Sequence, residues 1–233
     1  MDFLEKRSKS QNTNHIAFII LSYVSLSCTE WLYHKYIMHA TKESILYTKP
    51  LSQSHLNHHK TVLNDGTVVS NSHIGMIFSW LPATVIMSIY GTVLFYSLSK
   101  ALTTNYSLKI IIIMSVVISV FYGIIWNTVH PAFHDIKLKY SISEGFPSFD
   151  IPQNIKKNPI LIWLWKNHIC HHLNKGNNKC NYNIILPFAD FIMGTYENKI
   201  DNVDYCKLNI NNKDKKIKNL CKSKLEINDI VFK

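Results

Sequence analysis

Two long stretches of the chain carry no charged residue. Residues 74–99 are uncharged over 26 positions, and residues 110–129 are uncharged over 20 positions. A helix needs about 20 predominantly apolar residues to cross a bilayer, so each stretch is long enough. Pro82 and Gly91 lie in the first stretch, and membrane helices tolerate both residue types. A short loop joins the two stretches, which predicts a transmembrane helical hairpin; the alternative is two buried helices of a soluble core.

A third apolar segment precedes the hairpin. Residues 16–29 are apolar and then meet Glu30, so the segment spans a bilayer only if it continues to Tyr33; otherwise it is re-entrant or interfacial. We therefore expect an all-α integral membrane protein with this first hydrophobic helix and the hairpin. Its parts are a polar N-terminal segment at 1–15, a membrane-embedded domain at 16–200 and a polar, Lys- and Asn-rich tail at 201–233.

The distribution of lysine predicts the orientation in the membrane. The formal net charge is +10, and most of the lysines follow residue 129, whereas the hairpin loop carries only Lys100 and the nearby Lys109. Cytosolic segments are enriched in Lys and Arg, so both ends of the hairpin are expected in the cytosol. No nucleic-acid-binding motif accompanies the lysines, and anionic lipid headgroups explain the charge more simply. Five scattered cysteines without a CxxC motif favour reduced thiols.

Ten of the twelve histidines fall into four tight clusters. Residues three and four apart share a helix face, so the two HxxHH motifs each place three imidazoles on one stripe. The pair separated by five residues points in clearly different directions, and either serves two metals or flanks a bend. The clusters are His34 and His39; His55, His58 and His59; His130 and His134; and His168, His171 and His172.

Ten imidazoles exceed the needs of one metal ion, which takes about four to six ligands, whereas two ions with roughly five donors each fit. The second and third clusters flank the hairpin, so all ten histidines can meet on one side, in a cytosolic helical cap that holds a dinuclear metal site. Glu30 and Asp135 are candidates to orient His34 and His134, with a helix-terminus charge or a simple salt bridge as the alternative for each. His15 and His73 have no partner at helical spacing and are interpreted as structural.

The last cluster lies in a clearly bounded helix. Asn158 is a candidate N-cap, Pro159 suits the first helical position, and Gly176 suits the position just past the end. Trp163 and Trp165 are expected in the headgroup layer. The segment is therefore predicted to be an interfacial helix that delivers its histidines inward.

The four clusters, in this order, resemble the fatty acid hydroxylase/sterol desaturase superfamily of integral-membrane histidine-box di-iron enzymes, over roughly residues 28–196. The spacing of the third box is similar to that of the fatty acid 2-hydroxylase branch, and the first box also resembles that of carotenoid β-ring hydroxylases. The stretch after the last box is similar to the tail that follows it in this superfamily. Its matching residues are Asn181, Tyr182, Asn183, Pro187, Asp190, Gly194 and Thr195.

What the resemblance implies is an oxidoreductase that hydroxylates a lipid C–H bond, fatty acyl lipid above all, with dioxygen and two electrons at two iron ions held by the ten histidines. Zinc can replace iron in purified protein but has no redox chemistry. The chain has no haem motif, so a separate cytochrome b5 or ferredoxin is expected to bring the electrons. The alternatives are a carotenoid ring hydroxylase, a sterol oxidase or a lipid desaturase of the same superfamily, and a non-catalytic His-rich metal carrier. In a eukaryotic cell, the expected location is the endoplasmic reticulum membrane.

Overall fold

The computed structural model describes residues 2–62, 80–134, 158–173, 180–200 and 225–226. These residues are mostly helical, and one short antiparallel pair of strands accompanies the helices. The elements are α1 (Asp2–Leu32), the π-helices η1 (Tyr33–Met38) and η2 (Lys49–Gln53), α2 (Ser54–Thr61), α3 (Trp80–Ala101), α4 (Leu108–Phe133), α5 (Pro159–Leu173), α6 (Ala189–Ile192), β1 (Lys199–Ile200) and β2 (Leu225–Glu226).

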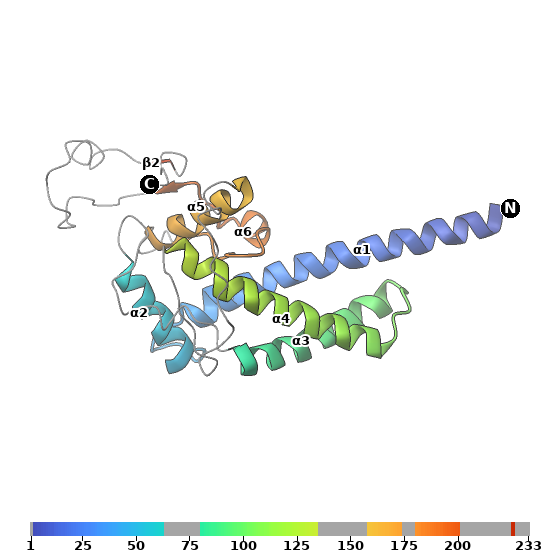
Figure 1. The fold of residues 1–233 in the computed structure, drawn as a ribbon, viewed down its shortest axis with the longest axis horizontal. Coiled ribbons are helices and arrows are strands. Elements are labelled where there is room, and N and C mark those ends of the chain that lie inside the picture. The colour runs from blue at the N-terminus through green and yellow to red at the C-terminus, as the bar shows by residue number, and fades with distance from the viewer. Residues whose placement is uncertain (1, 63–79, 135–157, 174–179, 201–224, 227–233) are drawn as a thin grey trace, which may run out of the picture.

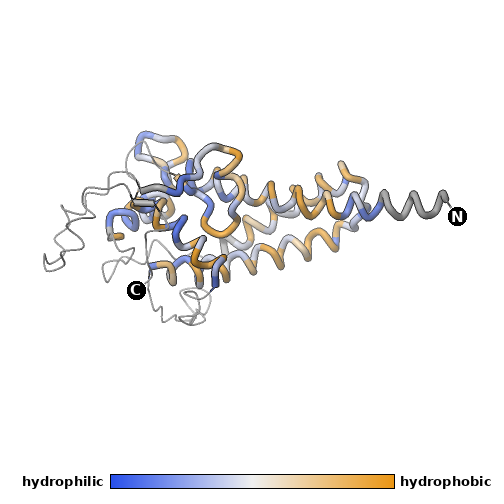
Figure 2. Tube along the Cα trace, turned by 90° about the horizontal axis from the view of Figure 1, so that it is seen from above, coloured by the Kyte–Doolittle hydropathy of each residue, from blue (hydrophilic) through white to orange (hydrophobic). Residues whose placement is uncertain are grey.

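The long helices lie at one end of the molecule and the short ones at the other. Helices α3 and α4 pack side by side as a hairpin, and α1 runs along them (Figure 1). Helices α2, α5 and α6 gather at the end opposite the α3–α4 loop (Figure 1). Apolar residues predominate along the long helices, whereas polar segments collect at the end that holds the short ones (Figure 2).

Two of the described helical segments are long and apolar enough to cross a membrane, namely Gln11–Met38 and Leu108–His130. Only 28% and 22% of the residues in their apolar windows are buried, whereas a core helix of a soluble protein would be mostly buried. The apolar segment expected at 16–33 is part of the first of these helical segments, which extends beyond it at both ends. The other expected span, 74–99, begins outside the described residues, and its later part forms α3.

Small side chains allow α3 and α4 to approach closely. A Cβ atom at Gly91 would lie 3.3 Å from the Cβ of Ser115, which is tighter than ordinary van der Waals contact. The Ser115 hydroxyl donates to the Ile111 carbonyl, so it is satisfied within its own helix. Phe18 of α1 packs beside this contact, in a cluster with Phe95 and Ile111. Small residues at a helix–helix contact are typical of membrane bundles, where packing drives association.

We expect Gly91→Leu to destabilise the α3–α4 contact. The larger side chain must displace Ser115 or separate the helices, and overpacking of this kind costs about 1–3 kcal/mol. The matched control is Val93→Leu, because Val93 is an exposed residue of the same helix. Thermal unfolding in detergent should show a lower midpoint for Gly91→Leu alone, and equal midpoints would contradict the close packing at this position.

A second core lies beneath the short helices. Leu164, Trp165 and Ile169 of α5 pack against Trp126 and Phe133 at the end of α4. The Trp165 indole N–H donates to the Phe133 carbonyl at 3.0 Å, so its polar atom is satisfied inside the protein. Trp165 therefore does not meet lipid headgroups as predicted, because the residue is buried against the end of α4.

The N-terminus of α5 is capped as the sequence predicted. The Asn158 side-chain oxygen accepts hydrogen bonds from the backbone N–H groups of Ile160 and Leu161, at 2.9 and 3.2 Å. Pro159 is the first helical residue, where its missing N–H costs nothing. The expected end of this helix at Gly176 lies outside the described residues, as does most of the tail at 201–233.

Candidate metal centre

The ten clustered histidines meet in two groups of five. In each group every histidine offers one ring nitrogen, and these five nitrogens lie within 4.8 Å of one another. Both groups consist of histidine alone within the described part of the chain. Group one contains His34, His39, His55, His59 and His171; group two contains His58, His130, His134, His168 and His172.

Each HxxHH helix divides its three histidines between the two groups. Helix α2 contributes His55 and His59 to group one and His58 to group two, whereas α5 contributes His171 to group one and the other two to group two. The first cluster lies wholly in group one and the third wholly in group two. Each of the two HxxHH helices, α2 and α5, therefore supplies histidines to both groups. Group one adjoins group two, since the ring centroids of His59 and His172 are 4.2 Å apart.

A π-helix explains how His34 and His39, five residues apart, reach the same group. In η1 the His39 N–H donates to the His34 carbonyl at 3.1 Å, which is the i→i+5 bond of a π-helix. An α-helix would point two such side chains in different directions. The wider turn instead brings them to one side, and this is a recurrent use of π-helical turns at functional sites.

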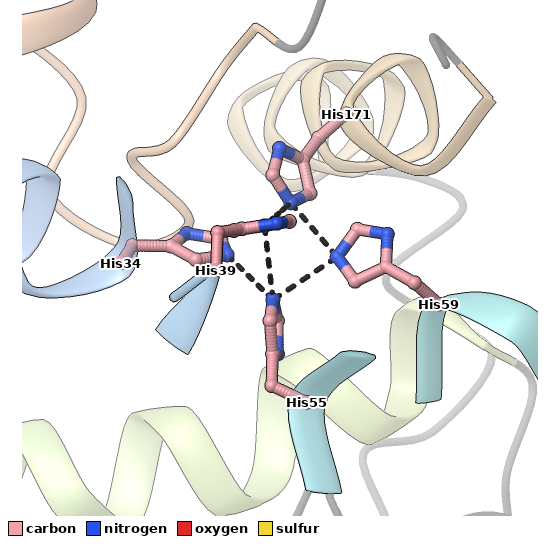
Figure 3. A group of neighbouring side chains, drawn as sticks. All are labelled: His34, His39, His55, His59 and His171. Carbon is pink, nitrogen blue, oxygen red and sulfur yellow. Dashed lines mark hydrogen bonds between the residues drawn. The ribbon is translucent and has the colours of Figure 1, made fainter. Parts of the chain in front are cut away.

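Four Nε2 atoms of group one form a closed ring (Figure 3). The sides of this ring are 3.2 Å for His39–His55, 3.0 Å for His55–His59, 3.1 Å for His59–His171 and 3.1 Å for His171–His39. The Nε2 atom of His34 lies 3.0 Å from that of His55. Two ligands at right angles on a metal with bonds of about 2.1 Å would be about 3.0 Å apart. The nitrogens are thus spaced as neighbouring ligands of one ion.

Hydrogen bonds alone cannot satisfy all the ring nitrogens of group one. The Nδ1 atoms of His34 and His171 face the carbonyl oxygens of Tyr182 and Cys180, which only accept, so these Nδ1 atoms carry the hydrogen. In the neutral ring their Nε2 atoms are then bare lone pairs. His55 Nε2 meets three neighbouring nitrogens, and a single N–H serves only one of them. A cation among the five nitrogens accepts every lone pair at once.

Group two has the same character. His134 and His168 approach to 2.8 Å and His168 and His172 to 3.1 Å, measured between Nε2 atoms. Neither ring nitrogen of His130 has a hydrogen-bond partner among the residues that the structure describes, although the side chain is 1% exposed. A buried imidazole without a partner is costly unless a ligand engages it. A metal ion is the ligand that this donor set suits.

Burial keeps these imidazoles in the form that binds metals. Burial lowers the pKa of His58 to about 2, and the neighbouring His134 adds to the effect. Burial, reinforced by the surrounding histidines, also holds the pKa values of His55, His59, His168 and His172 well below the ordinary value. A neutral imidazole offers its lone pair to a metal, whereas the protonated ring offers none.

The loop after α5 orients two of the candidate ligands. It supplies the Tyr182 carbonyl to His34 and the Cys180 carbonyl to His171, the latter at 2.6 Å. A hydrogen bond to the second ring nitrogen fixes both the tautomer and the orientation of a metal-bound histidine. Sequence reasoning missed both carbonyls, because a backbone acceptor leaves no side-chain signal.

Glu30 holds this loop in place. Its buried carboxylate accepts from the backbone N–H groups of Ile185 and Leu186, at 3.0 and 2.9 Å, and also from Ile184 at 3.3 Å. The Tyr122 hydroxyl and the Asn183 amide donate to it as well. Glu30 can thus orient His34 indirectly, as expected: it holds the loop, and a carbonyl of this loop faces the Nδ1 atom of His34.

Asp190 holds the same loop from the other side. Its carboxylate accepts from the backbone N–H groups of Tyr182 and Asn183, at 2.9 and 2.7 Å, and from the Thr195 hydroxyl at 2.7 Å. The Trp31 indole in turn donates to Thr195. Two buried carboxylates therefore fix the backbone whose carbonyl faces His34.

Three other residues were singled out in the sequence, and the structure describes one of them, His15. His15 contacts the Tyr106 hydroxyl through Nδ1 at 2.8 Å, and this contact fits a structural role. His73 and Asp135 lie outside the described residues. Cys170 of α5 and Cys180 are both buried, and their sulfur atoms lie 3.8 Å apart.

Comparison with known proteins identifies no relative. The chain matches no protein-family model, no curated protein and no solved structure. The described residues are mostly helical, and they include two helical segments apolar enough to cross a membrane and two adjoining groups of mostly buried histidines that can hold metal ions.

Proposed function

We propose that this protein is a membrane-bound non-haem di-iron oxygenase that hydroxylates a C–H bond of a lipid, with fatty acyl lipids as the substrate class. One observation carries the proposal. Ten histidines from four distant parts of the chain form two adjoining, all-histidine groups at the end of long apolar helices. The order and spacing of the four clusters, which resemble the fatty acid hydroxylase/sterol desaturase superfamily, support the choice of reaction.

The donor set fits iron, and the reaction requires it. Imidazole suits iron, zinc, copper and nickel alike, so the ligands alone do not choose among these metals. Bound iron would supply the redox chemistry that activates dioxygen and oxidises an unactivated C–H bond, and zinc has no redox states to do so. The chain's own part is to hold the ions through group one and group two and to keep water from them, since nine of the ten imidazoles are buried.

The apolar helices suit a substrate that stays in the bilayer. We infer that α1 and the α3–α4 hairpin cross the membrane, and that the short helices form a cap on its cytosolic side. The Lys-rich C-terminal part of the chain supports this orientation. A lipid chain then reaches the metal centre from the membrane without crossing water. A cytochrome b5 or ferredoxin docks on the cationic cytosolic face and supplies two electrons.

The test combines metal analysis with isotopic labelling. Detergent-purified protein expressed with added iron should contain about two irons per chain. With an electron donor and a panel of fatty acyl lipids under ¹⁸O₂, one labelled oxygen should appear in a hydroxylated product. The His171→Ala variant is the matched control for the chemistry, and it should yield no labelled product.

The products distinguish the proposed hydroxylase from a desaturase and from enzymes that act on other lipids. An unsaturated product without labelled oxygen would assign a desaturase, because both reactions begin by removing hydrogen from the same kind of C–H bond. Labelled product from sterols or carotenoids alone would move the substrate class to those lipids. Iron-reconstituted protein that neither consumes oxygen nor changes any lipid would contradict the oxygenase proposal.

A further inference from the structure

The short helices carry an apolar surface that the metal centre does not use. Phe191 and Ile192 of α6 are 51% and 55% exposed, and the neighbouring Met193 is 44% exposed. The Trp163 ring of α5 lies parallel to the Phe191 ring, at an interplanar angle of 2° and a centroid distance of 6.4 Å. Ile160, one helical turn before Trp163, is 66% exposed. We call these five residues the α5–α6 ridge.

The backbone beneath the ridge is held firmly in this position. The Ser27 hydroxyl of α1 donates to the Leu186 carbonyl at 2.6 Å and accepts from the Ala189 N–H at 3.0 Å. The Met193 N–H donates to the Ala189 carbonyl at 2.8 Å, which closes the turn of α6. Three consecutive apolar side chains are thus presented outward by a bonded backbone. An exposed apolar patch of this kind marks a contact surface.

The ridge is continuous with the apolar face of α1. The Tyr23 hydroxyl of α1 donates to the Pro187 carbonyl at 2.7 Å, two residues before α6 begins. Tyr23 belongs to an exposed face of α1 that also includes Ile16, Ile19 and Ile20. This face lies within one of the two segments apolar enough to cross a membrane. Figure 1 shows α6 beside the part of α1 that enters the cap.

We propose that the α5–α6 ridge lies in the boundary between headgroups and acyl chains of the same bilayer that α1 and α4 cross. This inference rests on the membrane placement in the proposed function. Aromatic rings with apolar neighbours are typical of this layer, and a short apolar surface can lie in it without spanning the membrane. The lipid surface is the partner because the ridge continues a face that already meets lipid.

The ridge sets the depth of the metal centre. Ile160 and Trp163 lie near the start of α5, and the first ligand of this helix, His168, follows Ile160 by eight residues. At about 1.5 Å per residue, the ligand lies only about 12 Å along the helix from the ridge. Contact of the ridge with lipid would thus keep the metal centre close to the membrane surface, within reach of a bilayer-resident chain.

The test places an environment-sensitive fluorophore on single introduced cysteines of the full chain in lipid nanodiscs. Ile192→Cys reports the ridge, Val117→Cys reports the exposed apolar face of α4, and Ile45→Cys reports a fully exposed residue in the turn before η2. The wild-type chain, labelled in the same way, gives the background from its own cysteines. Brominated phospholipid quenches from within the bilayer, and iodide quenches from water.

We expect brominated lipid to quench the label at position 192 as strongly as at position 117, with iodide quenching several-fold weaker than at position 45. Iodide quenching at 192 equal to that at 45, with 117 still quenched by lipid, would overturn the ridge contact and leave the membrane placement intact. Shielding of 192 from both quenchers would overturn it too, because a second protein copy would then cover the ridge. Absence of lipid quenching at 117 would instead remove the membrane placement itself.

Discussion

Replacement of His171 or His58 by alanine is expected to abolish turnover and lower the metal content, while the protein still inserts into membranes. His171 belongs to group one and His58 to group two, so the two variants probe the two groups separately. Loss of a residue that merely orients a ligand costs about 10–100-fold in metal affinity or activity. Loss of the ligand itself should exceed that range. The apolar helices that direct insertion are unchanged in both variants.

His15→Ala is the matched control for both variants. It removes an imidazole from the same chain, but His15 contacts Tyr106 on the far side of the fold from the two groups. Iron per chain, measured by elemental analysis, should fall in the two ligand variants and remain unchanged in His15→Ala. Membrane fractionation and circular dichroism check insertion and folding. Full activity in either ligand variant would remove that histidine from the metal centre.

Asp190→Asn is expected to weaken metal retention by about 10–100-fold, and to do so mainly in group one. The amide keeps the shape of the carboxylate but turns one acceptor into a donor. That N–H donor then faces the backbone N–H of Tyr182 or of Asn183. Both of these N–H groups donate to the Asp190 carboxylate in the wild-type protein. The loop should shift, and with it the Tyr182 carbonyl that faces His34. The positions of the group-two histidines do not depend on this carbonyl.

A graded chelator titration measures this effect. The wild-type protein should hold both ions to a similar chelator concentration. Asp190→Asn should lose the group-one ion first, and the group-two ion at a concentration between that and the wild-type value. Ser115→Ala is the control, because it removes a buried hydrogen bond within α4 and leaves the loop untouched. Equal retention of both ions in Asp190→Asn would contradict the orienting role. Early loss of both would indicate that Asp190 supports the whole cap instead.

Periodicity anticipated most of the helices, because it needs only local information. The uncharged stretch at 110–129 lies within α4, and Asn158 caps α5 as its position before Pro159 indicated. The division of each HxxHH motif between two groups was beyond such reasoning. Three imidazoles on one helix stripe still point in somewhat different directions, so they can belong to different groups. Which group each one joins depends on the histidines of the other helices around it. His58 therefore joins the group of His134 and His172, whereas His55 and His59 join that of His171.

Other features depend on departures from regular structure. The alignment of His34 with His39 required a π-helix, and the spacing alone had indicated either two metals or a bend. The position of the Tyr182 carbonyl depends on two carboxylates far apart in the sequence, Glu30 and Asp190. Trp165 was expected at the membrane surface because of its residue type, but the carbonyl of Phe133 satisfies its indole inside the cap.

Each HxxHH helix supplies histidines to both groups, and this division has a thermodynamic consequence. His171 and His172 are adjacent on α5, yet they serve different groups, and His58 and His59 of α2 do the same. An ion bound in one group therefore restrains the same two helices on which the other group depends. A second ion would then meet donors whose ordering entropy is already lost, so we expect positively cooperative loading. Such a coupling free energy is reciprocal, and loss of either ion would loosen the hold on the other.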